Sequence, residues 1–233
     1  MKGSLYLIPS VIGETTTDRV IPNDIIYIIN TIKVYIVENE RTARRQLIKM
    51  GIKTPIDELT FYVLDKHTNR NVIHTYLTPC ENGHIGLLSE AGVPAVADPG
   101  GEIVALAHEK GIRVIPLVGP SSILLSLMAS GMNGQSFVFH GYLPVKPNER
   151  AKKIKEIEHA SHRLKQTQIF IEAPYRNNQM LSDLLTICST NTRICVACNI
   201  TQDDEYIKTF PVHIWKGKKT DFHKKPAIFL LLA

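Results

Sequence analysis

The chain of 233 residues lacks the features that would place it in a membrane or secretory class. No stretch approaches the roughly 18 uninterrupted apolar residues of a membrane-spanning helix. The apolar part of its N-terminus, residues 5–9, is too short for a secretory signal and is instead typical of a first β-strand. We therefore expect a cytoplasmic protein with no membrane partner.

Cysteine is scarce, with only four residues: Cys80, Cys188, Cys195 and Cys198. Without a secretory signal, free thiols are favoured over a disulfide framework. The Cys195-Val-Ala-Cys198 spacing suits a metal or redox site, but neither a second pair nor a histidine partner accompanies it. It also falls in a predicted strand, where side chains three residues apart point to opposite faces. We expect core packing here and no metal.

Several common site motifs are also missing. Pro9-Ser-Val-Ile-Gly13 follows the first predicted strand in place of a Gly-x-Gly-x-x-Gly dinucleotide loop. The chain has no Gly-x4-Gly-Lys-Ser/Thr phosphate loop, no Gly-x-Ser-x-Gly elbow and no His-x-x-x-His metal spacing. These absences exclude the usual nucleotide-binding, α/β-hydrolase and zinc-enzyme interpretations.

The charge is positive, at +5 with a pI near 9.0, and it is unevenly distributed. A net positive charge permits an anionic partner without requiring one. Solvated surface charge and nucleic-acid binding both stay open as interpretations. Two segments are rich in basic residues: Lys146, Arg150, Lys152, Lys153, Lys155, Arg163 and Lys165 in the first, and Lys216, Lys218, Lys219, Lys224 and Lys225 in the second.

The first half of the chain alternates short apolar runs with helical patterns, which predicts a mostly parallel sheet covered on both faces. The strands are expected at 5–9, 34–37, 59–64, 84–88 and 112–117, and the helices at 24–32, 41–50, 71–81 and 102–110.

Strands outnumber helices in the second half, which predicts a second, α+β domain with a mixed sheet. We place the two domains at residues 1–117 and 118–233. The expected helices are 121–130, 147–165 and 174–188, and the expected strands 136–140, 168–171, 193–200, 206–210 and 227–232.

Two loops rich in glycine, proline and serine follow the predicted strands 84–88 and 112–117. In an open α/β sheet, such strand ends form the crevice where ligands bind. Gly92 permits close approach of backbone, and the prolines of the first loop stiffen it. Asp98 either contacts a ligand or caps the helix that follows. Ser121 and Ser122 start a helix, and they either cap it or offer hydroxyl groups to a ligand.

These loops resemble a known family. The chain contains Ser89-Glu-Ala-Gly-Val-Pro-x-Val-x-Asp-Pro-Gly, then Gly111-Ile-Arg-Val-Ile-Pro-Leu-x-Gly-Pro-Ser-Ser, then Phe139-x-Gly-Tyr-Leu-Pro144 and Ile171-Glu-Ala-Pro-Tyr-Arg176. In this order the motifs resemble the tetrapyrrole methylase-like methyltransferases and, among them, the 16S ribosomal RNA (cytidine-2′-O)-methyltransferases. The resemblance spans essentially the whole chain.

The resemblance implies a two-domain α/β, class III methyltransferase fold that is usually a homodimer, with S-adenosylmethionine held in the cleft between the domains. It further implies cofactor contacts made largely through backbone groups. The implied cofactor-binding residues are Ser89, Ala91, Gly92, Val93, Val96, Asp98, Ser121, Ser122 and Ala227.

The activity implied is 2′-O-methylation of a ribose in small-subunit ribosomal RNA, a step of ribosomal RNA processing. A small-molecule acceptor such as a tetrapyrrole stays open. So does a non-catalytic cofactor-binding relative, because Val11, Asn39 and Asn199 depart from the family pattern. A base would help a weakly nucleophilic ribose hydroxyl. The candidate catalytic residues are Glu90, Asp98, Glu172 and Arg176, with Glu14 as a further one, and the sequence does not choose among them.

Overall fold

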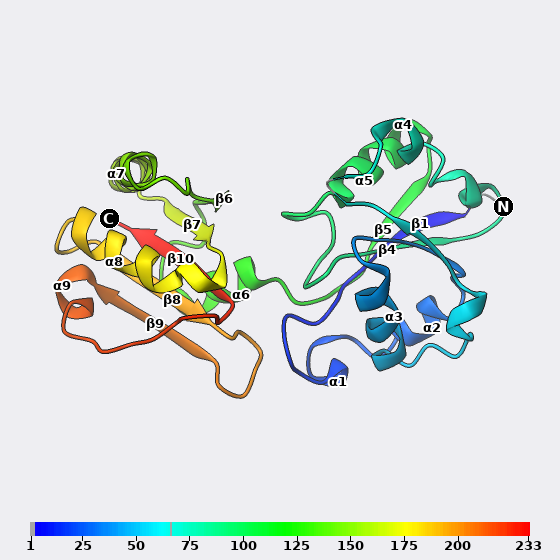
Figure 1. Cartoon of the computed structure of the whole chain (residues 1–233), viewed down its shortest axis with the longest axis horizontal. Coiled ribbons are helices and arrows are strands. Elements are labelled where there is room, and N and C mark those ends of the chain that lie inside the picture. The colour runs from blue at the N-terminus through cyan, green and yellow to red at the C-terminus, as the bar shows by residue number, and fades with distance from the viewer. Residues whose placement is uncertain (1–2, 66) are drawn as a thin grey trace. The chain divides into compact units, whose positions relative to one another are not determined.

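A computed structural model describes residues 3–65 and 67–233 of the chain. The chain divides into two compact units, Met1–Ser121 (unit 1) and Ser122–Ala233 (unit 2), each with its own sheet (Figure 1). In the part that the structure describes, no helix has both the length and the apolar character needed to cross a membrane.

Unit 1 is built on a five-stranded sheet in the order β3-β2-β4-β1-β5, and each neighbouring pair is parallel. This confirms the predicted parallel sheet. Strand β4 is buried along its whole length, as expected for a strand covered on both faces. The strands are β1 (Ser4–Ile8), β2 (Val34–Val37), β3 (Thr60–Val63), β4 (Ile85–Leu88) and β5 (Arg113–Pro116).

Two separate cores cover the faces of this sheet, and Figure 1 shows helices on both sides of it. Tyr35 of the sheet packs in one core with Ile29 and Leu47, whereas Ile36 packs in the other with Ile103. Alternate residues of one strand therefore serve opposite faces. The helices are α1 (Thr17–Val20), α2 (Ile25–Ile29), α3 (Glu40–Lys49), α4 (Arg70–Ile73) and α5 (Gly100–Glu109).

Two predicted helices of unit 1 are shorter than expected. The prediction of one helix over 71–81 is wrong: α4 ends at Ile73, and a 3₁₀ turn follows over Thr78–Glu81. Pro79 lacks the N–H that a continuous helix needs there. Helix α2 ends at Ile29 because Asn30 and Thr31 donate side-chain hydrogen bonds back to carbonyl oxygens, at 2.6 and 2.7 Å.

Unit 2 contains a mixed sheet in the order β6-β7-β10-β8-β9, which confirms the predicted α+β character. Only the β6–β7 pair is parallel; the β7–β10, β10–β8 and β8–β9 pairs are antiparallel. The strands are β6 (Phe137–Tyr142), β7 (Thr167–Ile171), β8 (Arg193–Cys198), β9 (Tyr206–Pro211) and β10 (Ala227–Leu232).

The faces of this second sheet also belong to different cores. One core contains residues of α7 (Pro147–Leu164), α8 (Asn177–Ile187) and α9 (Val212–Trp215), and the other contains residues of α6 (Ser122–Ser130). Cys198 lies in the first core and Cys195 in the second, so their thiols point to opposite faces of β8. That geometry confirms core packing for this cysteine pair.

Arg150 corrects the interpretation of the first basic segment as a solvated helix face. Its side chain is only 6% exposed and forms an ion pair with Asp183 of α8, with 2.6 Å between Nε and Oδ2. It also donates from Nη1 to the carbonyl of Val145 at 2.6 Å. Arg150 therefore joins two helices and a loop inside unit 2, while Lys152 and Lys155 of the same helix are exposed.

Candidate functional site

Three loops that follow adjacent strands of unit 1 pack directly against one another. The loop after β1 pairs with the loop after β4, where Ser10 and Gly92 exchange two backbone hydrogen bonds of 2.8 and 3.1 Å. The loop after β5 packs on both, since Gly119 lies against Pro9 and Pro120 lies against Gly92. Strand β4 lies on one side of β1 and β5 on the other, so the order of strands reverses direction here. Open α/β sheets bind ligands at the carboxyl ends of their strands at such a point.

Gly92 is required by its surroundings as well as by its backbone angle. Its φ is +73°, a left-handed conformation that side chains disfavour. A Cβ at this position would lie 3.1 Å from the Pro120 carbonyl oxygen and 3.6 Å from Cγ1 of Ile12. The three loops therefore meet at a position that only glycine fills without displacement.

A buried side-chain network fixes the loop after β4. The Ser10 hydroxyl can donate to either of two acceptors, Oε1 of Gln46 at 2.7 Å and the Ser89 carbonyl at 3.0 Å. Gln46 of α3 donates from Nε2 to the Glu90 carbonyl at 2.8 Å. Ser10 and Gln46 were not among the residues predicted from the sequence. Gln46 stands beside Leu47 on the buried face of α3, and a polar residue on an apolar face is the signal that would have found it.

Asp98 adopts the capping role that the sequence left open. Its carboxylate accepts from the Gly100 N–H, at the first residue of α5, at 2.7 Å, and from the Ala95 N–H at 2.9 and 3.0 Å. These bonds hold a loop in which Ala95 and Ala97 have φ of +66° and +63°. Burial raises the pKa of Asp98, and the two N–H bonds oppose that shift.

Glu38 is a further acidic residue at this edge that the sequence analysis did not select. It directly follows β2, and its carboxylate accepts from the Glu90 N–H at 3.3 Å. Burial raises the pKa of Glu38, the hydrogen bond lowers it, and the charges of Asp98 and Glu90 raise it again. Three carboxylates thus converge on the carboxyl ends of β2 and β4.

The raised pKa of Glu38 predicts a pH-dependent effect of Glu38→Gln. A carboxyl whose pKa is higher in the folded state contributes stability below the usual glutamate range, and this stability is lost as pH rises through the folded pKa. Removing the charge is therefore expected to raise the melting temperature at pH 7.5 and to change it little near pH 4. Thermal unfolding of both proteins at the two pH values measures this.

Glu109→Gln is the matched control, because Glu109 is an exposed glutamate of α5 in the same unit. It is expected to leave the melting temperature unchanged at both pH values. An equal gain for Glu38→Gln at pH 4 and pH 7.5 would show that ionisation is not the cause.

The remaining predicted residues of unit 1 lie in these same loops. Ser89 is buried and lies within 3.3 Å of the Ala91 and Gly92 carbonyls. Ala91 and Val96 are exposed, and Val93 is partly buried. The structure thus gathers the predicted residues on the loop after β4, while Ser121 ends the segment after β5.

The predicted residues of unit 2 lie at strand ends and at the start of α6. Glu172 directly follows β7, and its Oε1 accepts from Nε and Nη2 of Arg176 at 2.9 and 2.6 Å and from the Ala173 N–H at 2.7 Å. Ala227 starts β10, whose next residue, Ile228, pairs with Ile171 of β7. Ala227 and Glu172 therefore lie at the same edge of this sheet. Ser122 is the first residue of α6.

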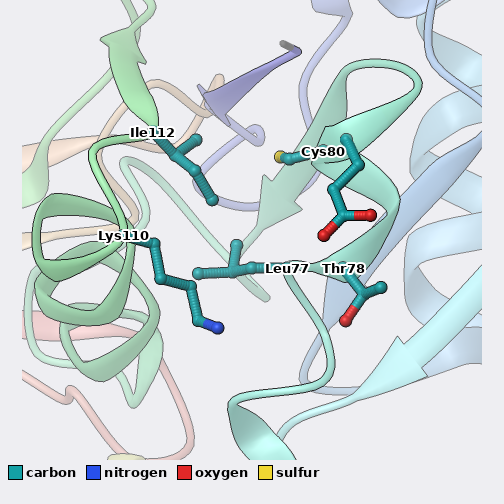
Figure 2. A pocket seen from close by; sticks show the side chains of 6 residues that line it. Leu77, Thr78, Cys80, Lys110 and Ile112 are labelled. Atoms are coloured by element: carbon teal, nitrogen blue, oxygen red, sulfur yellow. The ribbon is translucent and has the colours of Figure 1, made fainter.

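A pocket of about 240 Å³ lies at the opposite edge of the unit 1 sheet. Figure 2 shows the side chains of Leu77, Cys80 and Ile112 directed toward the same space. Burial raises the pKa of the Cys80 thiol to about 11, so it is neutral at physiological pH and a poor nucleophile. The residues that line the pocket come before β4 and β5 in the chain, whereas the predicted site residues of unit 1 come after these strands. It is lined by Leu77, Thr78, Cys80, Glu81, Lys110 and Ile112.

Among the described residues, no group of three or more histidine, cysteine or carboxylate side chains is arranged to hold a metal ion. All four cysteines are buried free thiols. The polar groups that the site offers are therefore backbone amides and carbonyls, hydroxyl groups and carboxylates.

The fold is similar to that of a solved structure. It is similar to the crystal structure of the methyltransferase CobJ, with a TM-score of 0.65 and 15% sequence identity over 99% of this chain and 94% of that chain. Together with the order of loops described above, this similarity defines a two-domain tetrapyrrole methylase-like fold and confirms the predicted fold class. No protein-family model matches the sequence.

Curated relatives identify the family. Ribosomal RNA small subunit methyltransferase I of Escherichia coli O157:H7 is 30% identical over 212 residues, covering 91% of this chain and 70% of the relative. The proteins of the same name from Xylella fastidiosa and Vibrio cholerae are 34% and 29% identical, and the aligned regions cover 62% and 68% of their lengths. The chain belongs to the ribosomal RNA small subunit methyltransferase I family.

Proposed function

We propose that this chain is an S-adenosylmethionine-dependent methyltransferase that methylates the 2′-hydroxyl of a ribose in small-subunit ribosomal RNA. Family membership supports this proposal. The observation that carries it is the junction of the loops after β1, β4 and β5, locked by the Ser10–Gly92 pair at the ligand-binding edge of the sheet.

The loops after β1, β4 and β5 fit the cofactor because they offer it backbone groups and small side chains. We propose that the loop from Ser89 to Asp98 and the residues Ser121, Ser122 and Ala227 bind it. A side chain at position 92 would press on the Pro120 carbonyl, so Gly92 fits there. Ala91 and Val96, on the same loop, are exposed. When bound, S-adenosylmethionine supplies a methyl group on a sulfonium, which is a good leaving group. The protein has to align the ribose oxygen with that methyl group and exclude water.

The proton of the ribose hydroxyl needs an acceptor, and the contacts of the candidate carboxylates differ. Asp98 is bonded to the N–H groups of its own loop, and Glu172 is paired with Arg176. Glu90 is exposed, while Gln46 and Glu38 hold its carbonyl and its N–H in place. We therefore propose Glu90 as the proton acceptor: its carboxylate would take the proton of the ribose hydroxyl, while bound S-adenosylmethionine would supply the methyl group and its sulfide would be the leaving group.

The test uses small ribosomal subunits, and their free RNA, from a strain that lacks this gene. Incubation with the protein and labelled S-adenosylmethionine is expected to place one label on a ribose, mapped by nuclease digestion and mass spectrometry. Glu90→Gln is expected to lower kcat about 100-fold, the scale of general base catalysis, with unchanged cofactor affinity. Absence of label in both substrates would overturn the ribosomal proposal.

Calorimetric titration with S-adenosylmethionine separates the two alternatives. No binding at millimolar cofactor would favour a non-catalytic relative. Cofactor binding without RNA labelling would favour a small-molecule acceptor, such as a tetrapyrrole, and uptake of that acceptor would be nearly independent of salt.

We further propose a cytoplasmic homodimer whose two domains are residues 1–117 and 118–233. Helix α6 leaves Met128 79% and Leu124 51% exposed, and apolar side chains of this size favour burial against a second chain. Sedimentation equilibrium is expected to give twice the 26.1 kDa of one chain. Fractionation of cells is expected to place the protein in the cytosolic fraction.

A further inference from the structure

Two exposed tyrosines lie at the same edge of the unit 2 sheet. Tyr142 is the last residue of β6 and is 64% exposed, and Tyr175 lies in the 3₁₀ turn after β7 and is 61% exposed. Strands β6 and β7 are parallel neighbours, with Tyr142 opposite Ile171. Their carboxyl ends, and therefore these two side chains, meet at the same edge of the sheet.

Local backbone features present Tyr142 at this edge. The register of the β6–β7 pair shifts between Phe139 and Tyr142, and Gly141 has a φ of +65° within the shift. Such a bulge changes the direction of the side chain that follows it. Contact with a ligand would bury this ring, which is 64% exposed, and would gain the free energy of that burial.

A buried ion pair supports the second tyrosine. Glu172, whose side chain is 1% exposed, pairs with Arg176 at 2.6 Å. The Arg176 guanidinium then lies 5.1 Å from the centre of the Tyr175 ring and donates to its hydroxyl at 3.2 Å. The hydrogen bond with Glu172 is the largest cause that raises the pKa of Arg176, and burial opposes it.

A cationic loop adjoins Tyr175. Lys224 donates its backbone N–H to the Pro174 carbonyl at 2.9 Å, and the side chains of Lys224 and Lys225 are exposed. The fully buried Asn177 holds this loop by donating to the carbonyls of Phe222 and Lys225 at 3.3 and 2.7 Å. The fold of unit 2 therefore holds this cationic loop beside Tyr175.

We propose that Tyr142, Tyr175, Arg176 and Lys224 form a platform that binds an unpaired segment of the RNA substrate, with bases stacked on the tyrosine rings and a phosphate beside Lys224. This deepens the proposed function and rests on it. Exposed aromatic faces beside fixed cations are what single-stranded RNA binds, because every base offers a π-face and every linkage a negative charge. A symmetric contact with a second copy would instead bring these like charges together.

The test measures the affinity of a fluorescein-labelled, 12-nucleotide single-stranded oligouridine by fluorescence anisotropy. Tyr142→Ala and Tyr175→Ala are each expected to raise Kd about 5- to 100-fold, the range for the loss of one base–aromatic stack. Tyr175→Phe keeps the ring and is expected to stay within about 2-fold of the wild-type Kd. Lys224→Ala is expected to reduce the slope of log K against log salt by about 0.7, the value for one phosphate contact on a single strand.

Tyr27→Ala is the control, since Tyr27 is 75% exposed but belongs to unit 1. It is expected to leave RNA affinity unchanged. Melting temperatures of all variants check that the exposed substitutions do not unfold the protein. An affinity within 2-fold of wild type for both tyrosine-to-alanine variants would overturn the platform, as would a shift of either variant from dimer to monomer in sedimentation.

The outcomes separate this proposal from the broader one. Labelling of ribosomal RNA by wild-type protein, with oligouridine affinity insensitive to both tyrosines, overturns the platform alone. Tyrosine-dependent binding without any labelling supports the platform and overturns ribosomal RNA as the methyl acceptor.

Discussion

Replacing Arg150 by leucine is expected to lower the free energy of unfolding by about 3–5 kcal/mol, the cost of removing one partner of a buried ion pair. Arg150 is the cation that faces Asp183, whose side chain is 20% exposed, and it also satisfies the Val145 carbonyl. Without it, a largely buried carboxylate and a carbonyl oxygen lose their charged donor. Thermal unfolding is expected to show a decrease of roughly 10 °C in the melting temperature, from about 2–4 °C per kcal/mol for a chain of this size.

Two further variants test the cause of that loss. Lys155→Leu changes an exposed lysine of the same helix and is expected to leave the melting temperature within about 2 °C of wild type, because surface substitutions cost about 0.5 kcal/mol or less. The double variant Arg150→Leu/Asp183→Leu removes both charges and is expected to be more stable than Arg150→Leu alone. A double variant less stable than the single one would contradict the unpaired charge as the cause.

Replacing Gly119 by alanine is expected to disrupt the junction of the three loops. A Cβ at this position would lie 2.1 Å from Cβ and 2.5 Å from Cγ of Pro9, so the loops after β1 and β5 have to separate. Overpacking of this kind costs about 1–3 kcal/mol of stability. We expect a lower melting temperature and about a tenfold loss of affinity for S-adenosylmethionine, equivalent to about 1.4 kcal/mol of lost contacts.

Gly83→Ala is the matched control, because a Cβ there meets no atom within 4 Å and the residue also belongs to unit 1. It is expected to retain both the wild-type melting temperature and cofactor affinity. Calorimetric titration measures the affinities. Unchanged binding by Gly119→Ala would show that the junction of the loops does not shape the cofactor site.

Most elements were predictable where local signals agreed. Helix α7 was expected over 147–165 and is observed over Pro147–Leu164, because a proline at its start and buried isoleucines at helical spacing mark it clearly. The prediction of one helix over 71–81 was wrong because it followed the apolar pattern and ignored Pro79. Short elements such as α1 and α9, of four residues each, were missed because one turn carries little periodicity.

The candidate site was predictable as a set of loops but not as a set of contacts. Gly92 and Asp98 were selected because their roles are local: one needs a left-handed φ, and the other accepts from N–H groups two and three residues away. Ser10 and Gln46 were missed because they meet 36 residues apart in sequence. A hydrogen bond between residues this far apart in sequence leaves no local sequence pattern.

The sequence by itself determined the order of the strands and of the longer helices, the family to which the chain belongs and the loops proposed to carry the site. Those properties depend on backbone preferences and short motifs, which neighbouring residues express. Only the tertiary structure decided that Arg150 is buried and that Glu90 is exposed. It also decided that the carboxylates of Asp98 and Glu172 already accept hydrogen bonds from other groups of the protein. Burial and charge pairing depend on residues that are distant in sequence, so they follow from the packed fold.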